Sequence, residues 1–408
     1  THTCRRMTKT RQNKRTRIVV LGWYGSNNTG DEALGQVIVS RLQESGFDDL
    51  VVLSTNPEKS EALFGAKSVS RRLYNPATLK ALIGARALIL GGGGLIQDGT
   101  SLYNLPVYAA YVAVAKLLGL KVIGWGLGAE PLWTLFGRLM ARFICRSSDY
   151  FSVRDKASKQ LLMKAGVPPQ YVRVTADPAI LLKPEPVVEK GIDPGKPVII
   201  FCVRHLPGIR PGITLHYLLP VSIRHRLGIE RHQEPGRVER VVEGVARSIK
   251  VAVEEFGAQA VLLPLWPNRD EEMLEVIAKA AVEMGVPDEA MLRAQLQHTP
   301  GKLAGYVGKA DMLVSMRLHA LIFAAPQGVP SIALSYARKV RGFMSELGFE
   351  RWVVEIERKM PDPDEMVAKV RALWTVRKEE SARLLEAAQR MEEAANADAE
   401  AIIRVLEN

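Results

Sequence analysis

With 408 residues the chain is too long for one ordinary hydrophobic core, so two domains are expected. Its 47% hydrophobic and 24% charged residues are typical of a soluble globular protein, and no apolar run reaches the ~20 residues that span a bilayer. Three scattered cysteines and seven histidines never pair at ligand spacing. This pattern argues against a disulfide framework, a metal site or a cofactor, and for a reduced, cytoplasmic compartment.

The net charge of +11 is concentrated at the N-terminus. Residues 1–17 hold seven Arg or Lys and no acid, which leaves +4 for the rest of the chain. Residues 1–16 lack the apolar segment of a secretory signal and are predicted to form a disordered basic arm. The arm is either a solubilising tail or a peripheral contact with anionic membrane. No nucleic-acid partner is expected, because the charge beyond the arm is modest.

The first half alternates short β-rich runs with helical periodicity. Strands are predicted at 17–22, 50–54, 86–90, 121–125, 149–152 and 172–175. Helices are predicted at 31–45, 76–84, 103–118, 131–146 and 155–165. Such alternation predicts a parallel sheet covered by helices on both faces, here over residues 17–183.

A second unit of the same kind follows a linker, residues 184–196, that is rich in proline and glycine. Strands are predicted at 197–203, 259–264, 310–315 and 331–335. Helices are predicted at 238–256, 269–285, 300–308, 318–326 and 338–347. A helical segment, 349–408, closes the chain with a long charged helix at 364–407. The predicted fold class is α/β, with two doubly wound Rossmann-like domains, 17–183 and 197–348, facing a cleft.

Residues 204–240 interrupt the second unit with seven Arg, four His and three Glu. Strand-to-helix loops are normally about two to six residues long. The segment is therefore either an insertion particular to this family or a functional one, such as a lid or a patch on a lipid surface.

The loop after the first strand, "GSNNTGDE", has the glycine spacing of a phosphate-binding loop, since four residues separate Gly25 and Gly30. Asp31 and Glu32 stand where that loop needs Lys and Ser or Thr, so a phosphate would be repelled. With Asn28, these acids suit the hydroxyls of a sugar, and a carboxylate can take a hydroxyl proton. Capping of the following helix is the alternative explanation of the acids.

A glycine run after the third strand, "LGGGGLIQDG", does not complete a dinucleotide fingerprint, because no glycine stands at 96. Gly93 and its neighbours would instead let a ligand or the facing domain approach the backbone. Gln97 and Asp98 are candidate hydroxyl partners. Arg154 ends a later strand and suits a carboxylate or phosphate. A surface pair between Arg154 and Asp155 is the alternative.

The second unit delivers a histidine and several cations to neighbouring strand ends. Arg317 and His319 lie in the turn after one predicted strand, and Ser335, Arg338 and Lys339 follow the next. A helix N-terminus beneath them adds affinity for anions. This arrangement predicts a site for a small, strongly anionic donor substrate, opposite a first domain that would bind a sugar-like acceptor.

Six motifs together resemble the polysaccharide pyruvyl transferase family, in particular bacterial members that modify secondary cell-wall polymers. They are "GWYGSNNTGDEAL", "LGGGGLIQDGTS", "KVIGWGLGAEPL", "FSVRDKAS", "ADPAILL" and "SMRLHALIFAAPQGVPSIALSYARKVRGF". The resemblance implies a GT-B-like fold and the transfer of pyruvate from phosphoenolpyruvate to two hydroxyls of one sugar. The product would be a 4,6-ketal on a lipid-linked N-acetylmannosamine unit at the cytoplasmic face, used in S-layer anchoring.

The resemblance also assigns roles to single residues. His319 in "MRLHA" matches the proposed general acid, and Arg154 and Lys339 match cations that hold phosphoenolpyruvate. Arg338 stands where many relatives have a small, acidic or proline residue. Either Arg338 or Lys339 could therefore be the cation that contacts the donor. Either acid of the opening loop would act as the base. A nucleotide-sugar-dependent glycosyltransferase on the same architecture is the alternative function.

Overall fold

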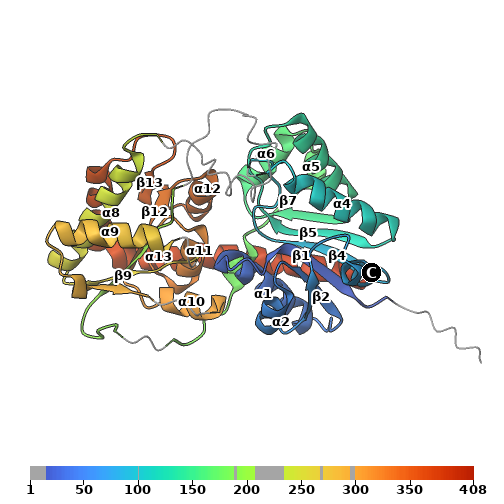
Figure 1. Ribbon diagram of the computed structural model, residues 1–408, viewed down its shortest axis with the longest axis horizontal. Helices are drawn as coiled ribbons and strands as arrows, with labels where there is room; N and C mark the ends of the chain where they lie inside the picture. Colours follow the sequence, from blue (N-terminus) through green and yellow to red (C-terminus); the bar gives the residue numbers. More distant parts are fainter. Residues whose placement is uncertain (1–14, 100, 188–190, 207–233, 267–269, 295–298) are drawn as a thin grey trace, which may run out of the picture.

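The computed structural model describes residues 15–99, 101–187, 191–206, 234–266, 270–294 and 299–408. Two parallel β-sheets, each covered by helices, lie side by side, with the first unit in blue to teal and the second in yellow to orange (Figure 1). The predicted α/β class, with two doubly wound units, is confirmed. The basic arm up to residue 14 and most of the 204–240 segment lie outside the described residues.

The first sheet has seven parallel strands in the order β3-β2-β1-β4-β5-β6-β7. Its strands are β1 (Ile18–Tyr24), β2 (Leu50–Ser54), β3 (Lys67–Ser70), β4 (Ala87–Gly91), β5 (Lys121–Leu127), β6 (Tyr150–Val153) and β7 (Arg173–Val174). Every residue of β2, β4 and β6 is buried. Burial on both faces explains why these strands are continuous apolar runs in the sequence.

Helices connect the strands of the first unit. They are α1 (Thr29–Glu44), α2 (Pro57–Phe64), α3 (Pro76–Leu82), α4 (Asn104–Leu117), α5 (Leu135–Ser147) and α6 (Lys156–Lys164), with 3-10 turns η1 (Pro169–Tyr171) and η2 (Pro178–Leu181). The sequence did not predict α2 or the edge strand β3. The strand "KSVS" is short, polar and half exposed, so it carries no hydrophobic pattern.

The second sheet has six parallel strands in the order β10-β9-β8-β11-β12-β13. Its strands are β8 (Val198–Cys202), β9 (Gln259–Leu262), β10 (Met291–Arg293), β11 (Met312–Ser315), β12 (Ser331–Ser335) and β13 (Val353–Glu355). Its helices are α8 (Arg237–Glu254), α9 (Glu271–Glu283), α10 (Pro300–Val307), α11 (Leu318–Ala324) and α12 (Arg338–Leu347), with 3-10 turns η4 (Asp288–Ala290), η5 (Ala325–Gln327) and η6 (Glu350–Trp352). The two edge strands, β10 and β13, were not predicted.

The last helix, α13 (Pro363–Glu407), connects the two units. It packs on α8 of the second unit near its start, and its final turns bury Ile402 and Leu406 against the first sheet (Figure 1). The buried carboxylate of Asp398 accepts hydrogen bonds from Tyr150 Oη at 2.6 Å and Ser152 Oγ at 2.8 Å. The helix was predicted, but its return to the first unit was not.

Direct contacts between the units surround the start of α1. Thr29 Oγ1 donates to the carbonyl of Leu265 at 2.9 Å. Ala33, Leu34 and Val37 of α1 belong to the same buried cluster as the second sheet. These contacts bring the carboxyl end of β1 up to the carboxyl end of β11, which is where ligands bind in folds of this kind.

Candidate active site

Gly30 and His319 meet in one of the contacts between the two units. Gly30 lies in the first turn of α1, and His319 lies in the first turn of α11, directly after β11. A Cβ atom on Gly30 would overlap the imidazole ring of His319. Only glycine therefore allows this close approach. Gly30, predicted as an acceptor-binding position, has a packing role in the structure.

His319 is a partly exposed side chain whose Nε2 atom is shielded from solvent. Among the described residues, Nε2 has no hydrogen-bond partner. Burial lowers the pKa of His319 to about 4; Asp177 opposes the shift, while Arg154, Lys339 and Arg317 add to it. The imidazole is thus neutral at pH 7 in the free protein, and an incoming anion would favour its protonation.

Asp31 faces the second unit from the first turn of α1. Its carboxylate accepts a hydrogen bond from Asn28 Nδ2, and a Cβ on Gly93 would lie 2.8 Å from its Oδ1 atom. Burial raises the pKa of Asp31 to about 6, against the opposing charges of Lys339 and Arg154. The influence of Lys339, which belongs to the second unit, places Asp31 within electrostatic reach of the opposite side of the cleft.

Glu32 points back into its own loop. It is 4% exposed, and its Oε1 accepts a hydrogen bond from the backbone N–H of Gly25 at 2.9 Å. The other oxygen, Oε2, is buried and has no partner among the residues described. Burial raises the pKa of Glu32 to about 7. The two acids therefore differ, because Glu32 closes the glycine turn while Asp31 faces the cleft.

Lys339 and Tyr336 form a basic cluster with Arg204 on the second unit. Lys339 Nζ lies 5.8 Å from the ring centroid of Tyr336, and Arg204 Nη1 donates to Tyr336 Oη at 3.0 Å. Burial would raise the pKa of Tyr336, yet Lys339, Arg204 and Arg317 together lower it to about 8. Within the described part of the chain, Lys339 has no carboxylate in ion-pair contact. Its charge is available to an anionic ligand.

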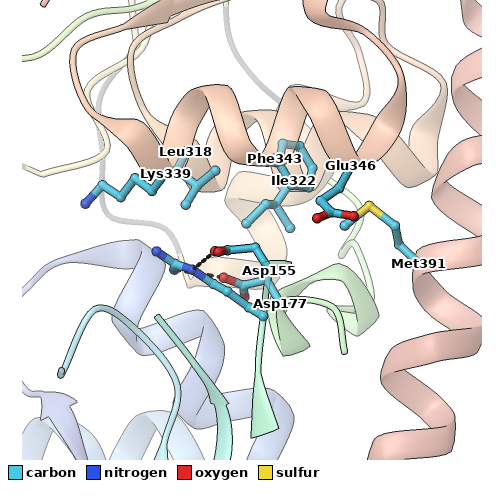
Figure 2. A pocket seen from close by; sticks show the side chains of 9 residues that line it. Asp155, Asp177, Leu318, Ile322, Lys339, Phe343, Glu346 and Met391 are labelled. Atoms are coloured by element: carbon cyan, nitrogen blue, oxygen red, sulfur yellow. Dashed lines mark hydrogen bonds and ion pairs between the residues drawn. The ribbon is translucent and has the colours of Figure 1, made fainter. Parts of the chain in front are cut away.

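Arg154 is buried at the end of β6 and already has two carboxylate partners. Its Nη1 lies 3.0 Å from Asp177 Oδ2 and its Nε lies 3.5 Å from Asp155 Oδ2. The three side chains line a pocket with Lys339 and apolar residues of α11 and α12 (Figure 2). The pair with Asp155, expected from the sequence on the surface, is present but buried, and Asp177 joins it.

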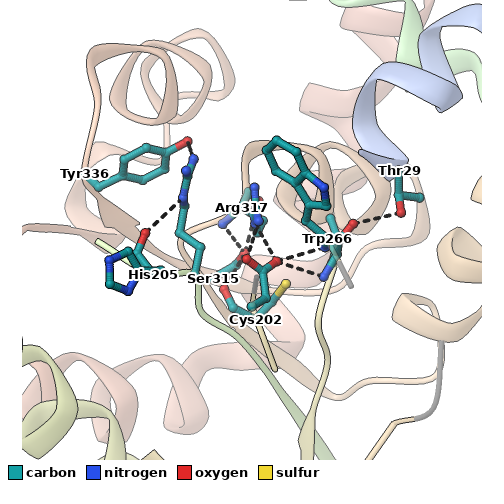
Figure 3. Close-up of polar contacts among 10 residues, drawn as sticks. Thr29, Cys202, His205, Trp266, Ser315, Arg317 and Tyr336 are labelled. Carbon is teal, nitrogen blue, oxygen red and sulfur yellow. Dashed lines mark hydrogen bonds and ion pairs between the residues drawn. The ribbon is translucent and has the colours of Figure 1, made fainter. Parts of the chain in front are cut away.

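Arg317 is paired with Asp270 through two of its three guanidinium nitrogens: Nε donates to Oδ2 at 2.8 Å, and Nη2 donates to Oδ1. The same carboxylate accepts the backbone N–H groups of Leu265 and Trp266 at 3.1 and 2.9 Å. Figure 3 shows Arg317 between Ser315 and Trp266, with Tyr336 to the left. Arg317 therefore fixes the loop that receives Thr29, and its charge lowers the pKa of the neighbouring His319.

Four other predicted site residues are placed as follows. Asp98 is buried and accepts the backbone N–H groups of Trp133 and Thr134 and the Thr134 hydroxyl, so it anchors the loop before α5. Ser335 is buried, and its hydroxyl donates to the carbonyl of Ala337 at 3.4 Å. Arg338 is exposed at the start of α12. Gln97 is partly exposed in the glycine loop.

Sequence reasoning missed four residues that shape the site: Arg204, Tyr336, Asp177 and Asp270. Tyr336 directly follows Ser335, the last residue of β12, and this position after a strand could have marked it as a site residue. Asp177 precedes a proline after β7, where it caps η2. The role of Asp270 could not be predicted, because an Asp at this position is typical of a helix start. Only the structure shows that it pairs with Arg317.

No group of three His, Cys, Asp or Glu is placed to hold a metal ion in the ranges that the structure covers. In the same ranges, no helix is long and apolar enough to cross a membrane.

The two facing sheets and the long returning helix define a GT-B-like fold. The UDP-GlcNAc 2-epimerase of Neisseria meningitidis, solved with UDP-GlcNAc, aligns with 95% of this chain and 99% of its own at 12% identity and a TM-score of 0.58. A glycosyltransferase of Rickettsia africae aligns with 96% of this chain and 98% of its own at 11% identity and a TM-score of 0.59. At such identities the likeness establishes the fold alone.

Residues 28–338 match the family model for polysaccharide pyruvyl transferases, and the chain belongs to that family. The matched range contains Gly30, Asp31, Arg154 and His319 and ends one residue before Lys339. The amylovoran biosynthesis protein AmsJ of Erwinia amylovora is 22% identical over 280 residues, which are 67% of this chain and 62% of AmsJ. The chain thus matches less than two thirds of the length of that curated relative.

Proposed function

We propose that this pyruvyl transferase uses phosphoenolpyruvate as its donor and two hydroxyls of a cell-wall glycan sugar as its acceptor, forming a 4,6-ketal and releasing phosphate. The observation that carries the proposal is the placement of His319. Its Nε2 has no partner among the described residues, and its ring lies against Gly30, the residue before Asp31 of the opposite unit. Lys339, a cation without a carboxylate partner in the described residues, acts on the pKa of both His319 and Asp31.

The donor binds on the second unit, beside Lys339. Phosphoenolpyruvate carries a phosphate and a carboxylate, and Lys339, Arg204 and Tyr336 are the polar groups of the basic cluster there. Arg154 and Arg317 contribute their positive field, while their guanidinium groups remain on Asp177 and Asp270. The bound anion offsets the neighbouring cations and raises the pKa of His319 above its low value in the free protein.

The chemistry begins with proton transfer from His319 to the methylene carbon of phosphoenolpyruvate. The carbon that bears the phosphate becomes an oxocarbenium-like centre, and one sugar hydroxyl attacks it as Asp31 takes the hydroxyl proton. The bond between this carbon and the phosphate oxygen then breaks. The second hydroxyl closes the ring and gives up its proton with the departing phosphate. General acid–base catalysis of this kind contributes about 10²–10⁴ in rate.

Asp31 is the base in this scheme, rather than Glu32. With a pKa of about 6, Asp31 is a carboxylate at pH 7, and it faces the cleft. Glu32 is held by the Gly25 N–H inside the loop. The acceptor therefore lies over α1 and the glycine loop of the first unit, where Asn28 and Gly93 flank Asp31.

We further propose that the acceptor is an N-acetylmannosamine unit of a lipid-linked precursor, which the enzyme meets at the cytoplasmic face of the membrane. The ketal would then serve the anchoring of S-layer proteins. Two observations support this proposal. Six motifs resemble the bacterial branch of the family, and the relative AmsJ is, by its name, a protein of amylovoran biosynthesis.

The test is incubation with phosphoenolpyruvate and disaccharides that carry free 4- and 6-hydroxyls. One phosphate should be released for each product whose mass has increased by one pyruvate less one water. The glycosyltransferase alternative predicts turnover of a nucleotide sugar and no release of phosphate from phosphoenolpyruvate. That outcome would overturn the proposal.

A further inference from the structure

Helix α5 turns an apolar stripe away from the core of the protein. Its inner side is formed by Gly137, Ala141, Ile144 and Cys145, which are all buried. Its outer side carries Leu135, Phe136, Leu139 and Phe143, which are 72%, 54%, 44% and 38% exposed. At 3.6 residues per turn these four side chains fall within about 100° of the helix circumference. A solvated helix places polar residues there, so this stripe requires an explanation.

The apolar surface extends beyond α5. Trp133, which is 59% exposed, directly precedes the helix. The neighbouring helix α4 adds Tyr103 and Val107, 52% and 41% exposed, at its N-terminal end (Figure 1). We call Trp133 and the four side chains of the stripe the α5 face.

Arginines border the α5 face, and no acid lies among them. Arg138, Arg142 and Arg146 follow one another at intervals of four residues, and the sequence holds no Asp or Glu between Glu130 and Asp149. None of the three guanidinium groups pairs with a carboxylate of the described residues; Arg138 Nε donates to the carbonyl of Leu132, and Arg146 lies over the ring of Tyr171. A second copy of the same face would bring like charges together, whereas an anionic surface complements them.

The α5 face also lies next to the candidate active site. Strand β5 ends at Leu127, and a Cβ on the following Gly128 would lie 2.7 Å from the guanidinium of Arg154. Asp98 then holds residues 133 and 134 at the start of the helix. The face thus begins at the edge of the sheet that opens into the cleft.

We propose that the α5 face docks on the interface of a membrane that contains anionic lipids. Leu and Phe side chains enter the acyl boundary, Trp133 lies at the headgroup level, and the arginines contact lipid phosphates, as in helices that lie in the plane of a bilayer. Docking would hold the cleft beside a lipid-linked acceptor. This last consequence rests on the proposed function, but the docking itself does not.

The test uses the full chain and vesicles of phosphatidylcholine with or without phosphatidylglycerol. Co-sedimentation should be about tenfold stronger with phosphatidylglycerol, and F136Q/L139Q/F143Q should bind at least about tenfold more weakly than the wild type. The matched control I83Q/V276Q/V282Q removes three exposed apolar side chains elsewhere, 61%, 51% and 43% exposed, and should bind like the wild type. All three proteins keep the basic N-terminal arm.

Brominated lipids provide a second measurement, because bromine quenches a tryptophan at the headgroup–acyl boundary. Quenching should fall in W133F and not in W266F. The proposal is overturned if the F136Q/L139Q/F143Q variant binds vesicles like the wild type, if binding needs only the arm, or if the wild type is a dimer that this variant converts to a monomer. Loss of vesicle binding with unchanged turnover of a water-soluble acceptor separates failure of docking from failure of the proposed function.

Discussion

On each side of the cleft a helix starts after a parallel strand, α1 on the first unit and α12 on the second. The helix dipole favours the charged residues at the start of α1 and opposes those at the start of α12. α1 carries Asp31 and Glu32 in its first turn, where the positive end of the dipole favours acids. α12 begins with Arg338 and Lys339 and has no acid in its first turn, which the dipole opposes. Helix stability can therefore explain acids at α1 but not the cations at α12. The cations are better explained by an anionic ligand.

The pKa values point the same way. Burial raises the pKa of Asp31 to about 6, so its charge at pH 7 opposes folding. Burial and the cations lower the pKa of His319 to about 4, and the cations bring the pKa of Tyr336 to about 8. The first side thus keeps a buried carboxylate that is unfavourable for folding, and the second side keeps cations whose field opposes a charge on His319. Groups perturbed in this way are typical of functional sites.

The largest effect is expected from replacing His319. H319Q removes the general acid while keeping similar volume, so kcat should fall by about 10²–10⁴. Phosphate release gives the rate, and circular dichroism and thermal unfolding check the fold. The control H205Q changes an exposed histidine at the end of the neighbouring β8 and should keep wild-type activity. Wild-type turnover by H319Q would remove His319 from the mechanism.

Asp31 should give the next largest effect. D31N should lower kcat by about 10² at pH 7, because the amide cannot accept the hydroxyl proton. Since the active form is the carboxylate, wild-type activity should fall as pH drops through about 6, and D31N should lose this limb. D31N should also unfold at a temperature no lower than the wild type at pH 7, since the raised pKa makes the charge unfavourable for folding. An unchanged acidic limb in D31N would assign the titration to another group.

Gly30 tests whether the contact between the units positions the histidine. G30A places a methyl group in the imidazole ring, so His319 must move, and kcat/KM should fall by about tenfold to 10². G342A is the matched control, because it adds the same methyl group to α12 where no atom lies within 4 Å. Equal activity of the two variants would show that His319 tolerates displacement.

Lys339 should give the smallest effect of the four, and mainly on donor binding. K339Q should raise KM for phosphoenolpyruvate about tenfold, as expected for the loss of one hydrogen bond to a charged group. R338Q, the exposed neighbour, should change KM little. A larger rise in KM for R338Q than for K339Q would assign the donor contact to Arg338. K339Q should also raise the pKa of His319 in the free protein, which an NMR titration of the imidazole can follow.

The sequence predicted most of the fold because the buried parallel strands and amphipathic helices carry strong periodic patterns. It failed at β3, β10 and β13, which are short edge strands, and at α2, which has eight residues. Local patterns also do not encode where α13 docks, because the contact of Asp398 with Tyr150 joins residues 248 positions apart.

The candidate site was predictable to the extent that a strand end fixes where a side chain goes. Asp31, Arg154, His319 and Lys339 each follow a strand, and the structure brings them into electrostatic reach of one another. The partners of charged residues were not predictable: Arg317 is 47 positions from Asp270, and Asp98 is 35 from Trp133. From the sequence alone, a charged residue cannot be distinguished as free for a ligand or paired with another residue of the protein.

The most direct test of the account is the reaction in D₂O with phosphoenolpyruvate and a disaccharide acceptor, followed by mass and NMR analysis of the product. Wild-type protein should form a ketal whose methyl group carries one deuterium from solvent, with one phosphate released per ketal, and H319Q should form almost none. Phosphate release without a ketal, or equal ketal formation by H319Q and the wild type, would contradict the account.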